Sequence, residues 1–198
     1  MTNFFGLTLL AYLLGSIPFG LVVSRALGGP DPRGLGSGNL GTANLYRLLG
    51  LKAAAFTLLG DAAKGALPVL LASSLLASLG VWQESAVAVV GAAAVLGHIF
   101  PLYLRFQGGK GVATAFGVAA ALSPWAALNL VLVYVLALAY TRIFSLSALI
   151  CAWLLPLAMG LFSNSKAYLL LAGGLSALIL VCHRENLERL FKGEEPRI

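Results

Sequence analysis

The chain has 198 residues, of which 60% are hydrophobic and only 10% are charged, and its mean hydropathy is +0.93. Soluble domains carry about 25% charged residues, so this composition excludes a soluble enzyme and a disordered chain. It predicts an all-α, polytopic membrane protein. The continuous apolar runs argue against a membrane β-barrel, whose strands alternate apolar and polar residues.

Basic residues outnumber acidic ones, with 13 Lys+Arg against 7 Asp+Glu and a net charge of +6. In a membrane protein such an excess marks cytoplasmic loops, so no nucleic-acid partner is expected. The first residues carry no Lys or Arg, which argues against a cleaved signal peptide. Cys151 and Cys182 lie in apolar runs and are interpreted as small apolar residues.

Seven transmembrane spans are expected in one domain over residues 1–198. The fourth span is short and ends at Ser123-Pro124, so a single helix over 112–141 with a kink at Pro124 is the alternative. Gly15-Ser16-Ile17-Pro18 predicts a kink in the first span. The expected spans are 4–24, 53–80, 85–104, 112–123, 125–141, 144–162 and 167–182.

The distribution of Lys and Arg favours seven spans over six. With seven spans and the N-terminus outside, nearly all basic residues fall on the inner side, and only Lys166 lies outside. Six spans would move Arg142 and the basic C-terminal tail to the outer side, against the positive-inside rule. We therefore expect the N-terminus outside and the C-terminus in the cytoplasm.

A glycine-rich loop follows the first span. Its residues 36–41 match GxGxxG, but dinucleotide binding needs a preceding strand, and here a membrane helix precedes the loop. Glycines can still turn backbone N–H groups toward an anion, and a helix that begins near Thr42 would add its dipole. A flexible glycine loop with a snorkelling arginine is the alternative. The candidate phosphate-binding residues are Gly36, Ser37, Gly38, Asn39, Gly41 and Asn44, with Arg47 as a fixed charge.

A second glycine-rich segment at 108–111 surrounds Lys110. It is not a Walker A loop, because no Ser or Thr follows the lysine. Gly108, Gly109 and Gly111 would let a phosphate approach the backbone while Lys110 supplies a point charge. A tight turn with a positive-inside lysine is the alternative, and the presence of the first loop favours phosphate binding.

Three polar residues inside apolar spans are expected to support these loops. Asp61 and Lys64 stand three residues apart, so they can neutralise each other within one helix. His98 lies near the inner end of the third span, where it can cap a carbonyl. A metal site is not expected, because the two histidines are far apart in sequence.

The C-terminal part adds Ser145, at the start of the sixth span, and the tail segment His183-Arg-Glu-Asn186. The segment 183–188 also has the form HxxxxE, similar to the HxxxxD motif of soluble-site acyltransferases. We give that likeness little weight, because the acid is Glu and the rest of the pattern is missing. His183 is expected to reach the same face as Arg47 and Lys110.

Together these segments resemble the bacterial acyl-phosphate:glycerol-3-phosphate acyltransferases, the PlsY family, over nearly the whole chain. The runs at 36–47 and 108–114 are long and correctly ordered, so the resemblance is specific. Thr42-Ala43 stands where Ala-Thr is common. The segments that carry the resemblance are GSIPFG at 15–20, GSGNLGTANLYR at 36–47, DAAKG at 61–65, GH at 97–98, GGKGVAT at 108–114 and HREN at 183–186.

The resemblance implies the first acylation of phospholipid synthesis in the bacterial cytoplasmic membrane, with the active site on the cytoplasmic face. The 1-hydroxyl of glycerol 3-phosphate attacks a long-chain acyl phosphate that is dissolved in the membrane lipid. The products are lysophosphatidic acid and phosphate, and no cofactor is expected. The implied catalytic residues are Ser37, Arg47, Lys110, His183 and Asn186, with Ser145 as a further phosphate-binding position.

Two questions remain open in the sequence. The base could be His183 or the phosphate of the substrate itself. A transporter for small phosphates would also need basic anion sites, although these would lie near the membrane midplane. A hydrolase of acyl phosphate and a purely structural protein are two further functions to be distinguished by experiment.

Overall fold

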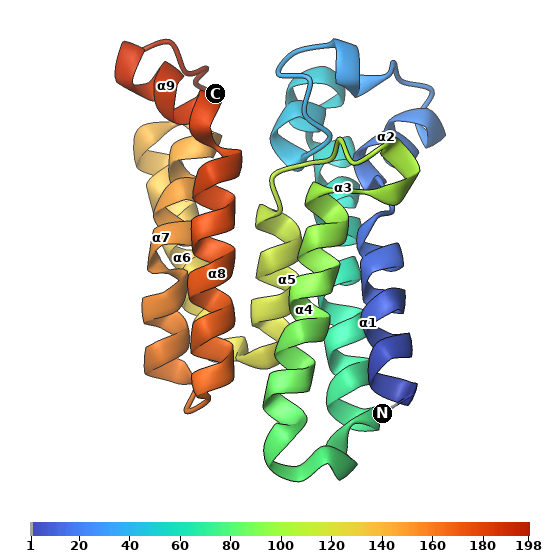
Figure 1. Cartoon of the computed structure of the whole chain (residues 1–198). Helices are drawn as coiled ribbons and strands as arrows, with labels where there is room; N and C mark the ends of the chain where they lie inside the picture. The colour runs from blue at the N-terminus through green and yellow to red at the C-terminus, as the bar shows by residue number, and fades with distance from the viewer. Residues whose placement is uncertain (1) are drawn as a thin grey trace. The chain divides into compact units, whose positions relative to one another are not determined.

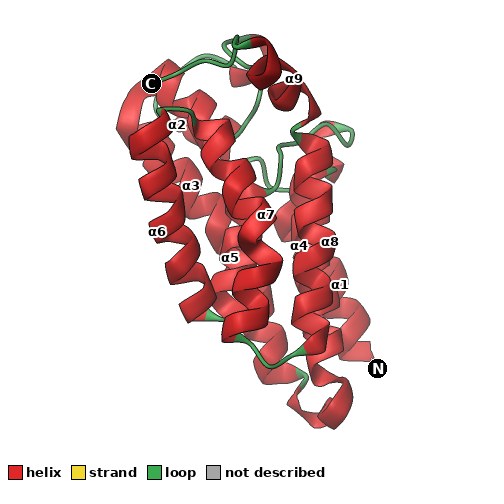
Figure 2. Ribbon diagram, turned by 90° about the vertical axis from the view of Figure 1, so that its left-hand side faces the viewer, coloured by secondary structure: helices red, strands yellow, loops and turns green. Residues whose placement is uncertain are grey.

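The computed structural model describes residues 2–198, and all regular elements in this part of the chain are helical (Figures 1 and 2). The all-α prediction is therefore confirmed. The α-helices are α1 (Thr2–Gly15), α2 (Phe19–Ala26), α3 (Thr42–Leu75), α4 (Gln83–Ile99), α5 (Val112–Leu122), α6 (Pro124–Thr141), α7 (Phe144–Phe162), α8 (Lys166–Cys182) and α9 (Arg184–Lys192). Short 3-10 turns lie between some of them: η1 (Pro32–Gly34), η2 (Ala77–Trp82) and η3 (Leu102–Leu104).

The helices form two compact units, Met1–Val118 and Ala119–Ile198. Within residues 2–198, four segments are long and apolar enough to cross a membrane, and the number rises to six if each of two bent helix pairs forms one span. α5 is apolar but has only 11 residues. Seven spans, one domain and an outside N-terminus therefore stay predictions.

The kink predicted in the first span is confirmed. α1 ends at Gly15, α2 begins at Phe19, and the two axes meet at 45°. Pro18 cannot donate a backbone hydrogen bond, so the helical ladder breaks there. The break exposes main-chain groups, and the carbonyl oxygen of Ile17 accepts a hydrogen bond from Lys64 in α3.

Small residues allow the helices of the first unit to approach closely. A Cβ at Gly15 would collide with the main-chain carbonyl of Ala94 in α4, and one at Gly97 would collide with the carbonyl of Tyr12 in α1. A Cβ at Gly117 in α5 would collide with the carbonyl of Ala62 in α3. Such backbone contacts are typical of membrane helices, whose association depends on packing and polar contacts.

α3 begins at Thr42, which confirms the helix start predicted there, although the span was expected only from residue 53. Gly50 interrupts the helix with a φ of 79° and a ψ of −170°. A residue with a Cβ would be strained at this φ, so glycine permits the interruption. The turns between Thr42 and Gly50 carry Asn44 and Arg47 in front of the apolar span.

In the second unit α6, α7 and α8 pack in chain order. The hydroxyl of Ser123 accepts a hydrogen bond from the Ala126 amide and donates one to the Phe162 carbonyl. Ser123 thus caps α6 and separates it from α5, so the alternative of one helix over 112–141 is wrong. α6 exposes a row of leucines, with Trp125 and Tyr140 exposed near its two ends.

The tail beyond α8 forms an additional helix that hydropathy did not predict. α8 and α9 meet at 58° around His183. α9 ends at Lys192 and is followed by Gly193, which has a φ of 72°, a conformation that favours glycine after a helix. The last residues then turn back, and the Ile198 amide donates to the Arg142 carbonyl at 2.8 Å.

Candidate active site

The first glycine loop is organised by the side chain of Asn44, which is 1% exposed. Its Nδ2 donates to the carbonyl oxygens of Pro32, Leu35 and Asn39 at 2.9–3.2 Å. Its Oδ1 accepts from the Ser37 amide at 3.0 Å. One side chain in the first turn of α3 therefore holds the loop from both sides.

Gly36 and Gly38 have φ values of 59° and 69°, which explains why the loop uses glycine at both positions. The amides of Ser37 and Gly38 donate inside the loop, to Asn44 Oδ1 and the Leu35 carbonyl. Binding of phosphate by these two amides would require an exchange of these hydrogen bonds. The phosphate-binding role of the loop stays a prediction, whereas the organising role of Asn44 is an observation that the sequence did not indicate.

The loop also places polar side chains at the surface. Ser37 and Arg47 are both exposed, and Arg47 lies on the helix that the loop precedes. Asn39 is half-buried, and its Oδ1 accepts from the Gly41 amide at 2.7 Å. Arg47 thus presents a guanidinium close in sequence to the N-terminus of α3, as an anion site would require.

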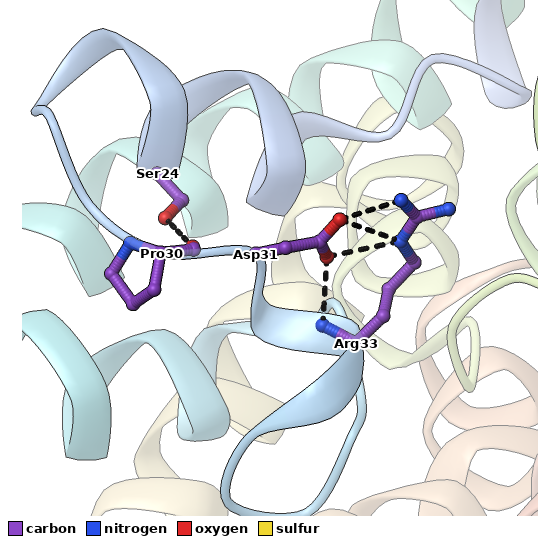
Figure 3. A network of polar contacts seen from close by, with 4 residues as sticks. All are labelled: Ser24, Pro30, Asp31 and Arg33. Carbon is purple, nitrogen blue, oxygen red and sulfur yellow. Dashed lines mark hydrogen bonds and ion pairs between the residues drawn. The ribbon is translucent and has the colours of Figure 1, made fainter.

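The chain that leads into this loop is fixed by local hydrogen bonds (Figure 3). Ser24 donates to the Pro30 carbonyl at 2.6 Å, and the carboxylate of Asp31 accepts from the Arg33 amide and guanidinium. These hydrogen bonds from Arg33 lower the pKa of Asp31 to about 2. Asp31 caps η1, which directly precedes the glycine loop.

The second glycine loop packs against the end of α4. The amides of Gly108 and Gly109 donate to the carbonyls of Ile99 and His98, each at 3.1 Å. A Cβ at Gly109 would collide with the His98 ring. Gly111 has a φ of 83° and directly precedes α5, and Lys110 is half-buried beside it. Lys110 therefore stands at a helix N-terminus, as Arg47 stands near that of α3.

The three supporting residues form one buried cluster in the first unit. Lys64 Nζ lies 2.8 Å from Asp61 Oδ1, so the ion pair expected from their spacing is confirmed. His98 Nδ1 lies 3.5 Å from the same oxygen. All three side chains are at most 7% exposed. Because His98 also contacts Gly109, the cluster connects α3 with the loop that carries Lys110.

A small pocket, with room for about one water molecule, opens beside this cluster. It is lined by the break between α1 and α2, by the Asp61–Lys64–His98 cluster and by both glycine loops, through Leu40, Gly108 and Gly109. The two loops, which are separated by some 70 residues in the sequence, thus meet at one place in the first unit.

The second unit brings together Ser145 and Asn186. Both donate to one carboxylate, that of Glu195, from Ser145 Oγ at 2.7 Å and from Asn186 Nδ2 at 2.5 Å. Arg189 donates to the other oxygen of Glu195 at 2.7 Å. Burial raises the pKa of Glu195, but these three hydrogen bonds outweigh it and lower the pKa below its ordinary value.

His183 lies at the junction of α8 and α9 and is 3% exposed. Its Nδ1 lies 2.8 Å from the Ile179 carbonyl. A carbonyl can only accept, so Nδ1 carries the proton, and in the neutral ring the lone pair then resides on Nε2.

Two residues of this site, Glu195 and Arg189, were not predicted from the sequence. The only local sequence signal for Glu195 is an acidic residue shortly after Gly193, the glycine that follows α9. Such a pattern is too common to indicate a site. The HxxxxE pattern has no support in the structure, because Glu188 pairs with Lys192 at 2.9 Å on the exposed side of α9. Of the predicted catalytic residues, the first unit holds Ser37, Arg47 and Lys110, and the second holds His183 and Asn186, together with the predicted phosphate-binding residue Ser145.

The family model described as glycerol-3-phosphate acyltransferase matches residues 5–193. The chain belongs to the glycerol-3-phosphate acyltransferase family. A family member from Pseudomonas fluorescens is 50% identical over 193 residues, covering 97% of this chain and 98% of that protein. One from Bordetella pertussis is 46% identical over 197 residues, covering 97% of this chain and 90% of the relative.

A solved structure of this family is also similar. The crystal structure of PlsY, an integral membrane glycerol 3-phosphate acyltransferase in its glycerol 3-phosphate form, is 39% identical, with a TM-score of 0.91 over 99% of this chain and 96% of that one. Its lysophosphatidic acid form gives a TM-score of 0.90 at 38% identity. The resemblance seen in the sequence is confirmed: this glycerol-3-phosphate acyltransferase family member is an enzyme and an integral membrane protein.

Proposed function

We propose that the enzyme transfers a fatty acyl group from a long-chain acyl phosphate to the 1-hydroxyl of glycerol 3-phosphate. The products are lysophosphatidic acid and inorganic phosphate. The observation that carries the proposal is the similarity to PlsY structures described with glycerol 3-phosphate and with lysophosphatidic acid. Glycerol 3-phosphate is one substrate of this reaction, and lysophosphatidic acid is one of its products.

Both substrates carry phosphate, and the first unit offers two loops suited to anions. Each loop is rich in glycine, leads into a helix N-terminus and has a cation beside it, Arg47 in one and Lys110 in the other. Helix N-termini and fixed cations bind phosphate. We assign Arg47 and Lys110 to hold substrate phosphates and to neutralise the charge that develops during transfer.

An acyl phosphate is a mixed anhydride with a good leaving group, so a covalent enzyme intermediate is not required. The oxygen of the 1-hydroxyl forms a bond to the acyl carbon, the bond from that carbon to the phosphate oxygen breaks, and phosphate leaves. The enzyme contributes by positioning and by charge stabilisation.

The hydroxyl proton must pass to a base. The geometry of His183, with Nδ1 donating to Ile179, leaves Nε2 as the basic nitrogen. The phosphate of glycerol 3-phosphate is the other candidate. We expect His183→Gln to retain measurable single-turnover chemistry at saturating substrate while it weakens substrate affinity, if the substrate phosphate is the base. A complete loss of that chemistry in folded protein would make His183 the base.

The acyl donor is a lipid, which suits an enzyme whose helices expose apolar side chains to the bilayer. The basic loops favour the cytoplasmic face of the bacterial membrane, from which glycerol 3-phosphate would enter. The tail and both glycine loops would then lie on that side, as the charge distribution predicts.

The test is an assay of purified protein in detergent with glycerol 3-phosphate and palmitoyl phosphate, without added metal. Phosphate and lysophosphatidic acid are measured together. We expect equal amounts of both products and a loss of both in Lys110→Ala, while Lys52→Ala, which removes an exposed cation, retains activity. Phosphate without lysophosphatidic acid would indicate a hydrolase. Uptake by proteoliposomes without either product would indicate a transporter.

A further inference from the structure

Glu195, in the tail beyond α9, contacts two residues that the resemblance places in the active site. Its Oε1 accepts from both Ser145 and Asn186, and its side chain is 4% exposed. We propose that Glu195 is a positioning residue that takes up the hydroxyl proton of Ser145, so that Ser145 meets glycerol 3-phosphate as a hydrogen-bond acceptor for its 2-hydroxyl. The proposal rests on the proposed function.

The polarity of these hydrogen bonds follows from the carboxylate. Its three donors, Ser145, Asn186 and Arg189, keep the pKa of Glu195 below its ordinary value, so the group is ionised at neutral pH. An ionised carboxylate can only accept. Ser145 has a single hydroxyl proton and directs it to Glu195 at 2.7 Å. Only lone pairs of Ser145 Oγ are then available to a ligand.

This polarity decides which part of the substrate Ser145 can bind. A phosphate oxygen is an acceptor, so it does not match a serine that offers only lone pairs. A hydroxyl group is a donor and does match. The resemblance implies phosphate binding by Ser145, whereas the polarity of this hydrogen bond favours the glycerol portion of the substrate.

The choice between the two hydroxyls of glycerol 3-phosphate follows from basicity. The 1-hydroxyl must lose its proton during acyl transfer, and a neutral serine oxygen is too weak a base to take it. The 2-hydroxyl keeps its proton throughout the reaction. Ser145 therefore suits the 2-hydroxyl, as a group that orients the substrate.

Backbone hydrogen bonds on both sides of Glu195 fix the C-terminal tail in front of Ser145. On one side of Glu195, the Glu194 amide donates to the Arg189 carbonyl at 2.8 Å, directly after the left-handed Gly193. On the other side, the Ile198 amide donates to the Arg142 carbonyl at 2.8 Å. Because Ser145 lies three residues beyond Arg142, the tail is fixed next to the residue that it orients.

The experiment compares glycerol 3-phosphate with 3-hydroxypropyl phosphate, which lacks the 2-hydroxyl, in wild type, Ser145→Ala, Glu195→Leu, which removes the hydrogen-bond acceptor of Ser145, and the double variant. We expect each single change to raise the KM for glycerol 3-phosphate roughly three- to tenfold, the effect of one lost hydrogen bond. The KM for acyl phosphate and the kcat should change little. The preference for glycerol 3-phosphate over the analogue should fall by the same factor.

The double variant should be no worse than either single variant, because both remove the same interaction. Glu194→Gln is the matched control, since it neutralises the adjacent exposed carboxylate, and it should behave as wild type. If Glu195→Leu lowers the folded fraction, the preference between the two acceptors still tests the role of Glu195, because a ratio of activities does not depend on the amount of folded enzyme, and Ser145→Ala tests the 2-hydroxyl contact.

Three outcomes would overturn the proposal. If the variants prefer glycerol 3-phosphate over the analogue as strongly as the wild type does, Ser145 does not contact the 2-hydroxyl. A loss of kcat with unchanged KM would indicate that Glu195 acts as a base through Ser145. A lower KM in Glu195→Leu would show that the carboxylate competes with the substrate phosphate. Failure of the wild type to acylate either acceptor would instead contradict the proposed function.

Discussion

Lys64 Nζ donates to the main-chain carbonyl of Ile17 at 2.8 Å, while it also pairs with Asp61 at 2.8 Å. Ile17 lies in the break between α1 and α2, and its carbonyl also accepts from the Phe19 amide at 3.1 Å. One ammonium therefore pairs with the buried carboxylate of α3 and donates to a carbonyl of the broken helix. Lys64 thus connects α3 with the break.

Lys64→Met is expected to destabilise the protein by about 3–5 kcal/mol, because it leaves the buried Asp61 carboxylate without its cation. Thermal unfolding in detergent measures the effect. Lys192→Ala, which removes an exposed ion pair, is the matched control and should cost at most about 1 kcal/mol. An unchanged melting temperature in Lys64→Met would contradict the structural role of the pair.

Gly109→Ala is expected to reduce kcat/KM on the order of a hundredfold, because the new Cβ would collide with His98 and the loop would carry Lys110 out of position. Gly174→Ala in α8, where a Cβ meets open space, should retain activity. Steady-state kinetics on both variants checks this. Wild-type kinetics in Gly109→Ala would show that the loop tolerates the displacement.

Asn44→Ala is expected to loosen the segment 32–41, because it removes the four hydrogen bonds that Asn44 makes to this loop. Buried partners left without a hydrogen bond cost about 1–3 kcal/mol each. Hydrogen–deuterium exchange should rise in the peptide over 32–41 and stay unchanged in α7. Equal exchange in variant and wild type would mean that the glycines alone define the loop.

The ion pair of Asp31 and Arg33 gives a prediction for acid conditions. The pKa of Asp31 is about 2 in the folded protein, below its ordinary value of 3.8. A lowered folded pKa means that the stabilisation is complete above the unfolded value and is lost as the pH falls toward 2.

The difference in melting temperature between wild type and Asp31→Asn should therefore be constant from about pH 5 to 8 and shrink below about pH 4. Because both side chains are exposed, the difference should also be small and should decrease with added salt. A difference that grows as the pH falls would contradict the assignment.

The seven-span topology can be tested by cysteine labelling after replacement of Cys151 and Cys182. A membrane-impermeant maleimide should label Asn164→Cys, in the exposed loop between α7 and α8, in intact cells. Gly34→Cys, where the structure leaves open space, should react only after the membrane is permeabilised. The reverse pattern would place the N-terminus in the cytoplasm.

Much of the helical architecture could be predicted from hydropathy. The expected span 144–162 coincides with α7, and 167–182 differs from α8 by one residue. The start of α3 near Thr42 was predicted from the glycine-rich loop before it and not from hydropathy. The turns from Thr42 to Gly50 contain Arg47 and are too polar to appear as an apolar span. α9 was missed for the same reason, since a short charged helix produces no apolar run.

The site could be predicted in part. The two glycine loops could be predicted as candidate anion sites, because few other structures need several glycines close to a cationic side chain. Asn44 was expected to face phosphate, although the fold uses it inside the loop. Glu195 was not recognised, because its contact with Ser145 joins residues 50 positions apart and leaves no local pattern.

The aromatic residues of α6 have a consequence for the surrounding lipid. Trp125 and Tyr140 are 66% and 91% exposed, and several leucines between them face outward. At the rise of an α-helix, the interval from 125 to 140 separates the two residues by about 22 Å. Aromatic rings settle at the two headgroup boundaries, and a typical hydrocarbon layer is about 30 Å thick. A hydrocarbon layer whose thickness matches this spacing is thinner than average around α6. Lipids with shorter acyl chains form such a layer and therefore reduce the hydrophobic mismatch.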